Sequence, residues 1–147
     1  MGCDIHAVLQ RKQKDNTWIT IATDLFGRDY RLFGYLSGVR HIGGEAIAHE
    51  GFPDDFETNR INGSLRHGKF CMGEHSYGHC TLEEFCAYEI KQEEPADSYF
   101  IKKEGNTISI TFNPPDDEDF GVKALQAGFR NLFFDLENYR LVFGYDS

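Results

Sequence analysis

Hydrophobic and polar residues alternate over the first dozen positions of the chain. One face would carry Ile5, Ala7 and Leu9, and the other Asp4, His6 and Gln10, while Val8 departs from the pattern. A period of two is typical of a half-buried strand, so we predict a strand over residues 3–12. The turn residues Asp15 and Asn16 precede a β-branched and aromatic stretch at 18–22, which predicts a hairpin.

Helical spacing recurs in three later segments. Helices are predicted over residues 30–36, 82–92 and 120–136, the first ending at Gly38 and the second starting from a Thr81/Glu84 capping box. Residues 99–103 and 107–112 should form a second hairpin, in which Gly105 and Asn106 supply positive φ. The apolar stretch 139–145 predicts a last strand inside the sheet, next to the first strand.

Residues 40–79 are rich in Gly, His and charge, and they contain few apolar runs. We predict a long irregular loop there, of the kind that is functional in many compact domains. The order of elements predicts an α+β fold: a single domain spanning residues 1–147, with a mostly antiparallel sheet and about three helices packed on it.

Composition and charge narrow the classes of function. The 147 residues have a net charge of −9, and residues 76–147 carry six Lys or Arg against fourteen Asp or Glu. An acidic surface repels phosphates, so nonspecific nucleic-acid binding is not expected. Without a signal segment or an apolar run of about 18 residues, we expect a cytoplasmic protein with reduced cysteines and no membrane contact.

The opening hexapeptide MGCDIH concentrates reactive side chains. Asp4 and His6 would point the same way from a strand, as a hydrogen-bonded pair or as two ligands of one metal, with Cys3 towards the core. The alternative is a solvated sheet face. Lipidation is not expected, because a myristoylation signal needs Ser or Thr where His6 stands.

Two further groups of residues leave alternatives open. Residues 71–80 hold two Cys and two His, but their spacing is poor for zinc, and a plain surface loop is the alternative. His75 and Ser76 could pair as base and hydroxyl, although no nucleophile-elbow motif surrounds them. The arginines at 28, 31 and 40 would suit an anion pocket or would simply be solvated.

Several segments together resemble an uncharacterised family of small proteins from tailed phages, prophages and bacteria that begin Met-Gly-Cys-Asp-Ile-His. The resemblance runs discontinuously along the chain, and Phe52 stands where Leu is expected. The positions that carry it are Gly2, Cys3, Asp4, His6, Tyr30, Leu32, Phe33, Gly38, Val39, Arg40, Gly51, Pro53, His75, Ser76, Arg140, Phe143 and Asp146. It implies a phage context rather than a reaction.

From the residues and the resemblance together we predict one ligand-binding site at an end of the sheet, under the 40–79 loop. Its residues would be Asp4, His6, Tyr30, Arg40, His75 and Ser76. The function predicted first is a phage-type accessory protein that binds a host protein or a small anionic ligand, such as a nucleotide, and interferes with host defence.

Two other functions remain open. A metal-dependent hydrolase of phosphoesters would hold a divalent metal with Asp4, His6 and His75. An acidic decoy would use Glu93, Glu94 and the run at 116–119 to dock on a basic protein. The sequence leaves the oligomeric state open, and it does not decide whether any cofactor is bound.

Overall fold

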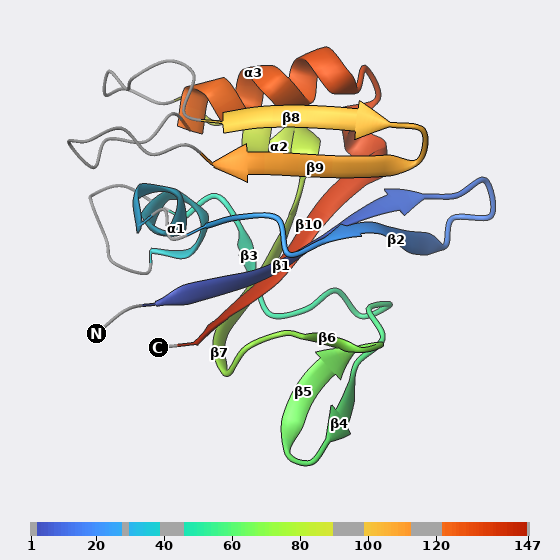
Figure 1. Cartoon of the computed structure of the whole chain (residues 1–147), viewed down its shortest axis with the longest axis vertical. Coiled ribbons are helices and arrows are strands. Elements are labelled where there is room, and N and C mark those ends of the chain that lie inside the picture. Colours follow the sequence, from blue (N-terminus) through green and yellow to red (C-terminus); the bar gives the residue numbers. More distant parts are fainter. Residues whose placement is uncertain (1–2, 28–29, 39–45, 90–98, 113–121, 147) are drawn as a thin grey trace.

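The computed structural model describes residues 3–27, 30–38, 46–89, 99–112 and 122–146 of the chain (Figure 1). These residues have the predicted α+β fold, in which antiparallel strands dominate and three α-helices pack with them. The central sheet has the order β2-β1-β10-β7-β3, and every neighbouring pair is antiparallel. Its strands are β1 (Asp4–Lys12), β2 (Trp18–Thr23), β3 (His49–Glu50), β7 (His75–Thr81) and β10 (Tyr139–Asp146).

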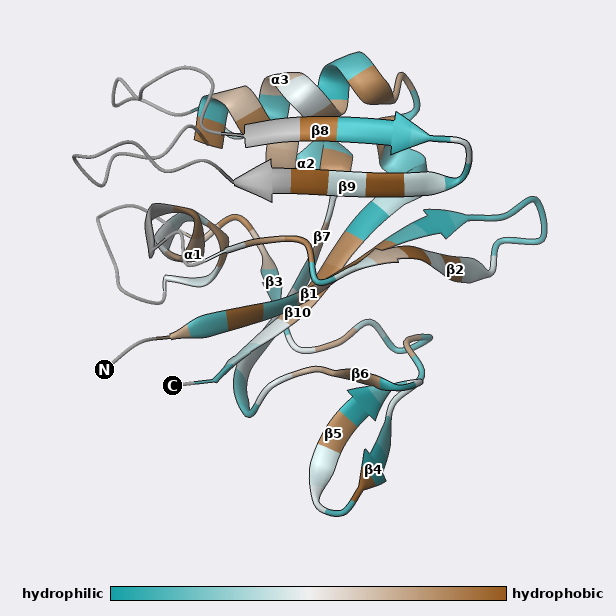
Figure 2. Cartoon of the chain, viewed as in Figure 1, coloured by the Kyte–Doolittle hydropathy of each residue, from teal (hydrophilic) through white to brown (hydrophobic). Residues whose placement is uncertain are grey.

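The first and last strands pair along their whole length, as the sequence predicts. Asp4 lies opposite Asp146, and Arg11 lies opposite Tyr139. Figure 2 shows hydrophobic and hydrophilic residues alternating along β1. The buried set that was predicted for one face, Ile5, Ala7 and Leu9, belongs to the main hydrophobic core together with Cys3.

The helices and a β-hairpin cover this main core. The elements are α1 (Tyr30–Ser37), α2 (Leu82–Ala87), α3 (Val122–Leu132), β8 (Tyr99–Glu104) and β9 (Thr107–Phe112), with a short 3-10 turn at Leu136–Asn138. The three helices and the hairpin are where the sequence predicts them, but α2 ends at Ala87 rather than near 92, and α3 ends at Leu132 rather than near 136. In the hairpin turn, Gly105 alone has positive φ. No helix in the described part of the chain is long and apolar enough to cross a membrane.

The prediction of an irregular loop over residues 40–79 is wrong for much of its described part. Besides β3 and β7, this part forms a small sheet of β4 (Asn59–Ile61), β5 (Ser64–His67) and β6 (Phe70–Cys71). These strands are short and polar, so they lack the alternation that marks a strand. The consecutive residues Asn62 and Gly63 are a sequence signal for a hairpin turn. In the structure they take φ of 53° and 81°, as a type I′ hairpin turn requires.

A second, smaller core joins the small sheet to the central sheet. It consists of Val8, Phe56, Met72 and Val142, with Phe52, Phe70 and Tyr77 packed against it. Val8, which departs from the alternation of β1, is therefore buried on the side away from the main core. We call this side of the central sheet the second face. In Figure 1 the small sheet and the helices lie on opposite sides of the central strands.

Candidate functional site

Asp4 and His6 lie near the start of β1, on the second face. The prediction that they share a face is confirmed by the register, which places Asp4 opposite Asp146 and His6 opposite Gly144. His6 Nε2 lies 2.7 Å from Asp146 Oδ2, and both side chains are about one quarter to one third exposed. The carboxylate that the imidazole contacts at this distance thus comes from the other end of the chain.

His75 and Ser76 lie at the start of β7, where the strand is irregular. His75 Nδ1 is 2.9 Å from Ser76 Oγ, and Ser76 has a φ of 55°. His75 lies opposite Tyr145, whereas His6 lies opposite Gly144. Adjacent residues of β10 point to opposite faces of the sheet. His6 and His75 are therefore on opposite faces, and the structure does not bring the three predicted metal ligands together.

The described residues also do not form a metal site from other side chains. Within the described residues, no group of three or more His, Cys, Asp or Glu side chains has the proximity that a metal ion needs. The predicted cluster at 71–80 is divided by the fold: Cys80 is fully buried in the main core, whereas Cys71 lies in the small sheet beside Ser64. Burial raises the pKa of the Cys80 thiol, which keeps it protonated.

Some predicted site residues lie outside the described residues. They are Arg28, Arg40, Glu93, Glu94, the acidic run 116–119 and the side chains of Tyr30 and Arg31. The predicted anion pocket at the first helix and the acidic docking surface therefore stay predictions. Ser76 does line a hollow of about 210 Å³, together with Ser37, His49 and Tyr77.

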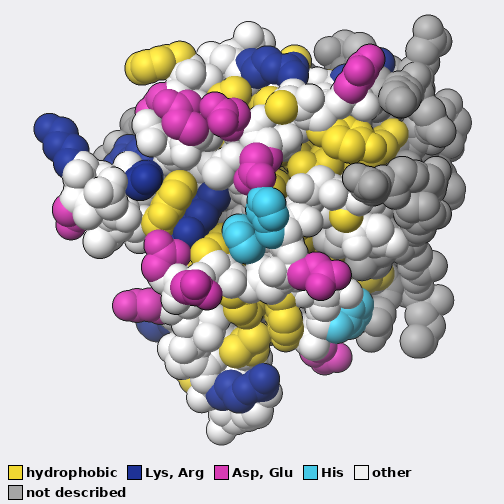
Figure 3. Space-filling view, turned by 180° about the vertical axis from the view of Figure 1, so that it is seen from behind, with side chains coloured by type: hydrophobic (Ala, Val, Ile, Leu, Met, Phe, Trp, Pro, Cys, Tyr) yellow, Lys and Arg dark blue, Asp and Glu magenta, His cyan; other side chains and the backbone are white. Residues whose placement is uncertain are grey.

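The structure reveals a row of polar residues that crosses the second face, and sequence reasoning did not single it out as a site. Each strand of the central sheet contributes to it, and the row comprises Thr20, Gln10, Arg140, Thr81, His79 and His49. Direct cross-strand pairing places these side chains on one face of the sheet. Figure 3 shows the molecule from behind, with His side chains beside Lys or Arg and with acidic side chains around them.

Arg140 is the buried centre of this row, with 6% of its surface exposed. Its Nε donates to Gln10 Oε1 at 2.7 Å, and its Nη1 donates to Asp55 Oδ1 at 2.9 Å. The guanidinium carbon lies 4.3 Å from the centre of the Trp18 ring. Nη2 is buried and has no hydrogen-bond partner. Burial lowers the pKa of Arg140 and Asp55 opposes this shift, and the group remains charged.

Hydrogen bonds continue from Arg140 in one direction across β1 and β2. Gln10 Nε2 donates to Thr20 Oγ1 at 3.1 Å, and Thr20 Oγ1 lies 2.7 Å from His67 Nε2. His67 Nδ1 is 2.6 Å from the carbonyl oxygen of Glu57, so Nδ1 carries the proton and Nε2 accepts from Thr20. The ring of His67 stacks on Phe56 at 4.2 Å, which fixes its orientation.

A cavity of about 390 Å³ opens beside this chain of hydrogen bonds. It is lined by Gln10, Asn16, Thr17, Trp18, Thr20, Asp55, Glu57 and His67. Its volume falls in the range typical of small-molecule sites. The lining thus combines one indole ring with several hydrogen-bonding groups. Arg140 is not one of the lining residues, but its guanidinium contacts Gln10, Trp18 and Asp55, which are. This arrangement can bind and orient a small polar ligand.

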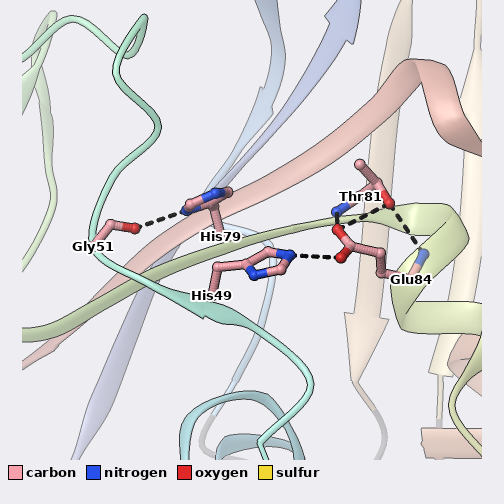
Figure 4. Close-up of polar contacts among 5 residues, drawn as sticks. All are labelled: His49, Gly51, His79, Thr81 and Glu84. Carbon is pink, nitrogen blue, oxygen red and sulfur yellow. Dashed lines mark hydrogen bonds and ion pairs between the residues drawn. The ribbon is translucent and has the colours of Figure 1, made fainter.

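The other end of the polar row is held by the start of α2 (Figure 4). His49 Nε2 lies 2.6 Å from Glu84 Oε2, and Glu84 also completes the predicted capping box with Thr81. His79 Nδ1 donates to the carbonyl oxygen of Gly51 at 2.8 Å. The rings of His49 and His79 are 5.3 Å apart. One carboxylate therefore links β3 to the helix that follows β7.

The pKa of Glu84 gives this link a dependence on pH. Burial raises the pKa, but hydrogen bonds from Thr81 and His49 outweigh it and bring the pKa below its ordinary value. A lowered folded-state pKa stabilises the fold above the unfolded pKa, and this contribution is lost as pH falls through the folded pKa. Between about pH 5 and pH 3, the free energy of unfolding should therefore fall more in wild type than in Glu84→Gln.

Urea denaturation at a series of pH values measures this difference. The matched control is Glu83→Gln, which alters the exposed neighbouring residue of the same helical turn. The control should follow the wild-type curve. If Glu84→Gln followed it as well, Glu84 would not couple the fold to pH.

Comparisons with known proteins do not identify a family for this chain. No family model, no curated protein and no solved structure matches the chain. The candidate function therefore rests on the site itself and on the resemblance of the sequence motifs.

Proposed function

We propose that this chain is a phage-type accessory protein that binds a small anionic ligand in the cavity beside Arg140. The observation that carries the proposal is the buried Arg140 with its unpartnered Nη2, next to a cavity of about 390 Å³. A guanidinium binds phosphate or carboxylate through paired N–H donors. The motif resemblance supplies the phage context, in which sequestering an anionic signal would interfere with host defence.

A nucleotide is the ligand to test first. Trp18 offers an aromatic edge to a base, and Gln10, Thr20 and His67 offer hydrogen-bonding groups to a sugar or base. Arg140 supplies the positive charge for a phosphate in a chain that is otherwise strongly acidic. The same features do not include a catalytic metal centre, so the hydrolase that the sequence also predicts has less support than binding.

Calorimetric and thermal-shift titrations with nucleoside phosphates and cyclic nucleotides test the proposal. At least one ligand should bind with a Kd below about 1 mM and raise the melting temperature, because binding to the folded state alone stabilises it. The variant Thr20→Val removes a hydroxyl that lines the cavity and should weaken binding. The control Thr107→Val makes the same change at an exposed position of β9. Absence of binding at millimolar concentrations of every ligand would overturn the nucleotide proposal.

A further inference from the structure

Only one of the two terminal nitrogens of the Arg140 guanidinium donates a hydrogen bond in this structure. Nη1 donates to one oxygen of Asp55, whereas Nη2 on the same guanidinium has no partner. Carboxylates and phosphates normally pair with a guanidinium through two parallel hydrogen bonds, one from each of two nitrogens. A buried donor left unsatisfied costs free energy, so this site is set up for a second oxygen that Asp55 does not supply.

Asp55 is placed so that it can leave Arg140 without disturbing the fold. It lies between β3 and β4 in a stretch without helix or strand, and its side chain is 57% exposed. The next residue, Phe56, is buried in the second core and stacks on His67. Phe56 therefore holds the backbone, while rotation of the Asp55 side chain takes its carboxylate into solvent.

We infer that Asp55 is an internal stand-in for the ligand, and that the ligand carries an oxyanion that replaces it on Arg140. In the bound state two ligand oxygens accept from Nη1 and Nη2, and Asp55 turns to solvent. This inference rests on the proposed function and names both the chemical group that the site selects and its internal competitor. The shared chemistry is that of a carboxylate or a phosphate group.

The competition has a measurable consequence for affinity. In wild type an incoming anion must displace a charge-assisted hydrogen bond, and it meets the repulsion of the nearby Asp55 carboxylate. In Asp55→Asn the competitor is neutral, so we expect anions to bind on the order of tenfold more tightly than to wild type. The control is Asp54→Asn, which makes the same charge change at the exposed preceding residue and should bind as wild type does.

The experiment is isothermal titration of wild type, Asp55→Asn and Asp54→Asn with inorganic phosphate, acetate and AMP, at one ionic strength set with chloride. Tighter binding to Asp55→Asn alone supports the inference. Preference for phosphate over acetate assigns the oxyanion to a phosphate group, and the reverse preference assigns it to a carboxylate.

Two failures can be told apart in the same titrations. If a ligand bound equally to all three proteins, Asp55 would not be a competitor, and the inference would be overturned while the proposed function stood. If no protein bound any of the three anions, the anion site itself would be overturned. The melting temperature of each variant in chloride alone confirms that it is folded.

Discussion

Substitution of Arg140 by Met is expected to abolish anion binding and to destabilise the fold by about 2 kcal/mol. The loss of binding follows because the described lining of the cavity contains no Lys or Arg, so the positive charge must come from Arg140, which contacts Gln10, Trp18 and Asp55 of that lining. The loss of stability follows because Gln10, only 3% exposed, keeps a buried oxygen without its donor. Calorimetric titration and urea denaturation of the same sample measure the two effects.

A second substitution separates the two effects. In the double variant Arg140→Met/Gln10→Met, both partners of the buried hydrogen bond become apolar groups of similar length, and such paired replacement is close to neutral. The double variant should therefore recover most of the lost stability but none of the binding. Binding that survived in the single or double variant would mean that the ligand does not contact Arg140.

Replacement of Gly144 by Ala is expected to destabilise the fold by about 3 kcal/mol, or to prevent folding. A Cβ atom at this position of β10 would overlap the carbonyl oxygen of Met72 and come within 2.5 Å of the Tyr77 ring. Both groups belong to the second core, where the backbone of Met72 cannot move away without separating the small sheet from the central sheet. Thermal denaturation measures the change.

The control for this prediction is Gly128→Ala in α3. Its Cβ would meet Cδ1 of Ile101 at 2.6 Å, which is the flexible end of a side chain rather than backbone. Alanine also favours a helix over glycine by about 1 kcal/mol, which offsets the contact. We expect the stability of this variant to stay within about 1 kcal/mol of wild type. A Gly144→Ala protein as stable as this control would disprove the close packing at Met72.

The elements that the sequence predicted are those with a strong local pattern. Alternation identified β1, the Thr81/Glu84 capping box identified the start of α2, and helical spacing identified α3. The pairing of the last strand with the first was predicted from the apolar character of residues 139–145. Such signals depend on residues only a few positions apart, so they can be recognised from the sequence without knowledge of the fold.

The second face could not be predicted in the same way. Its core gathers Val8, Phe56, Met72 and Val142 from four distant segments, and no local pattern indicates that these four residues meet. Arg140 would be taken for a surface residue, because only the fold brings it to Gln10, 130 residues away, and to Asp55, 85 residues away. The one local signal passed over was the Asn62-Gly63 turn, which would have placed a hairpin in the predicted loop.

The predicted metal ligands Asp4, His6 and His75 are not brought together for a related reason. The prediction assumed that reactive residues near one sheet end converge, but His6 and His75 take opposite faces of the sheet. The buried arginine with an unused donor becomes recognisable only once partners for each nitrogen can be counted.

Binding of an anion beside Arg140 can be tested most directly through Trp18, the only tryptophan of the chain, which stacks on Arg140 and lines the cavity. Its indole N–H gives one resolved signal in a ¹H–¹⁵N correlation spectrum, which can be followed during titration with AMP. We predict a saturable shift of this signal in wild type and no such shift in Arg140→Met/Gln10→Met. An indole signal that stays unchanged while calorimetry detects binding would place the ligand elsewhere and contradict an anion site beside Arg140.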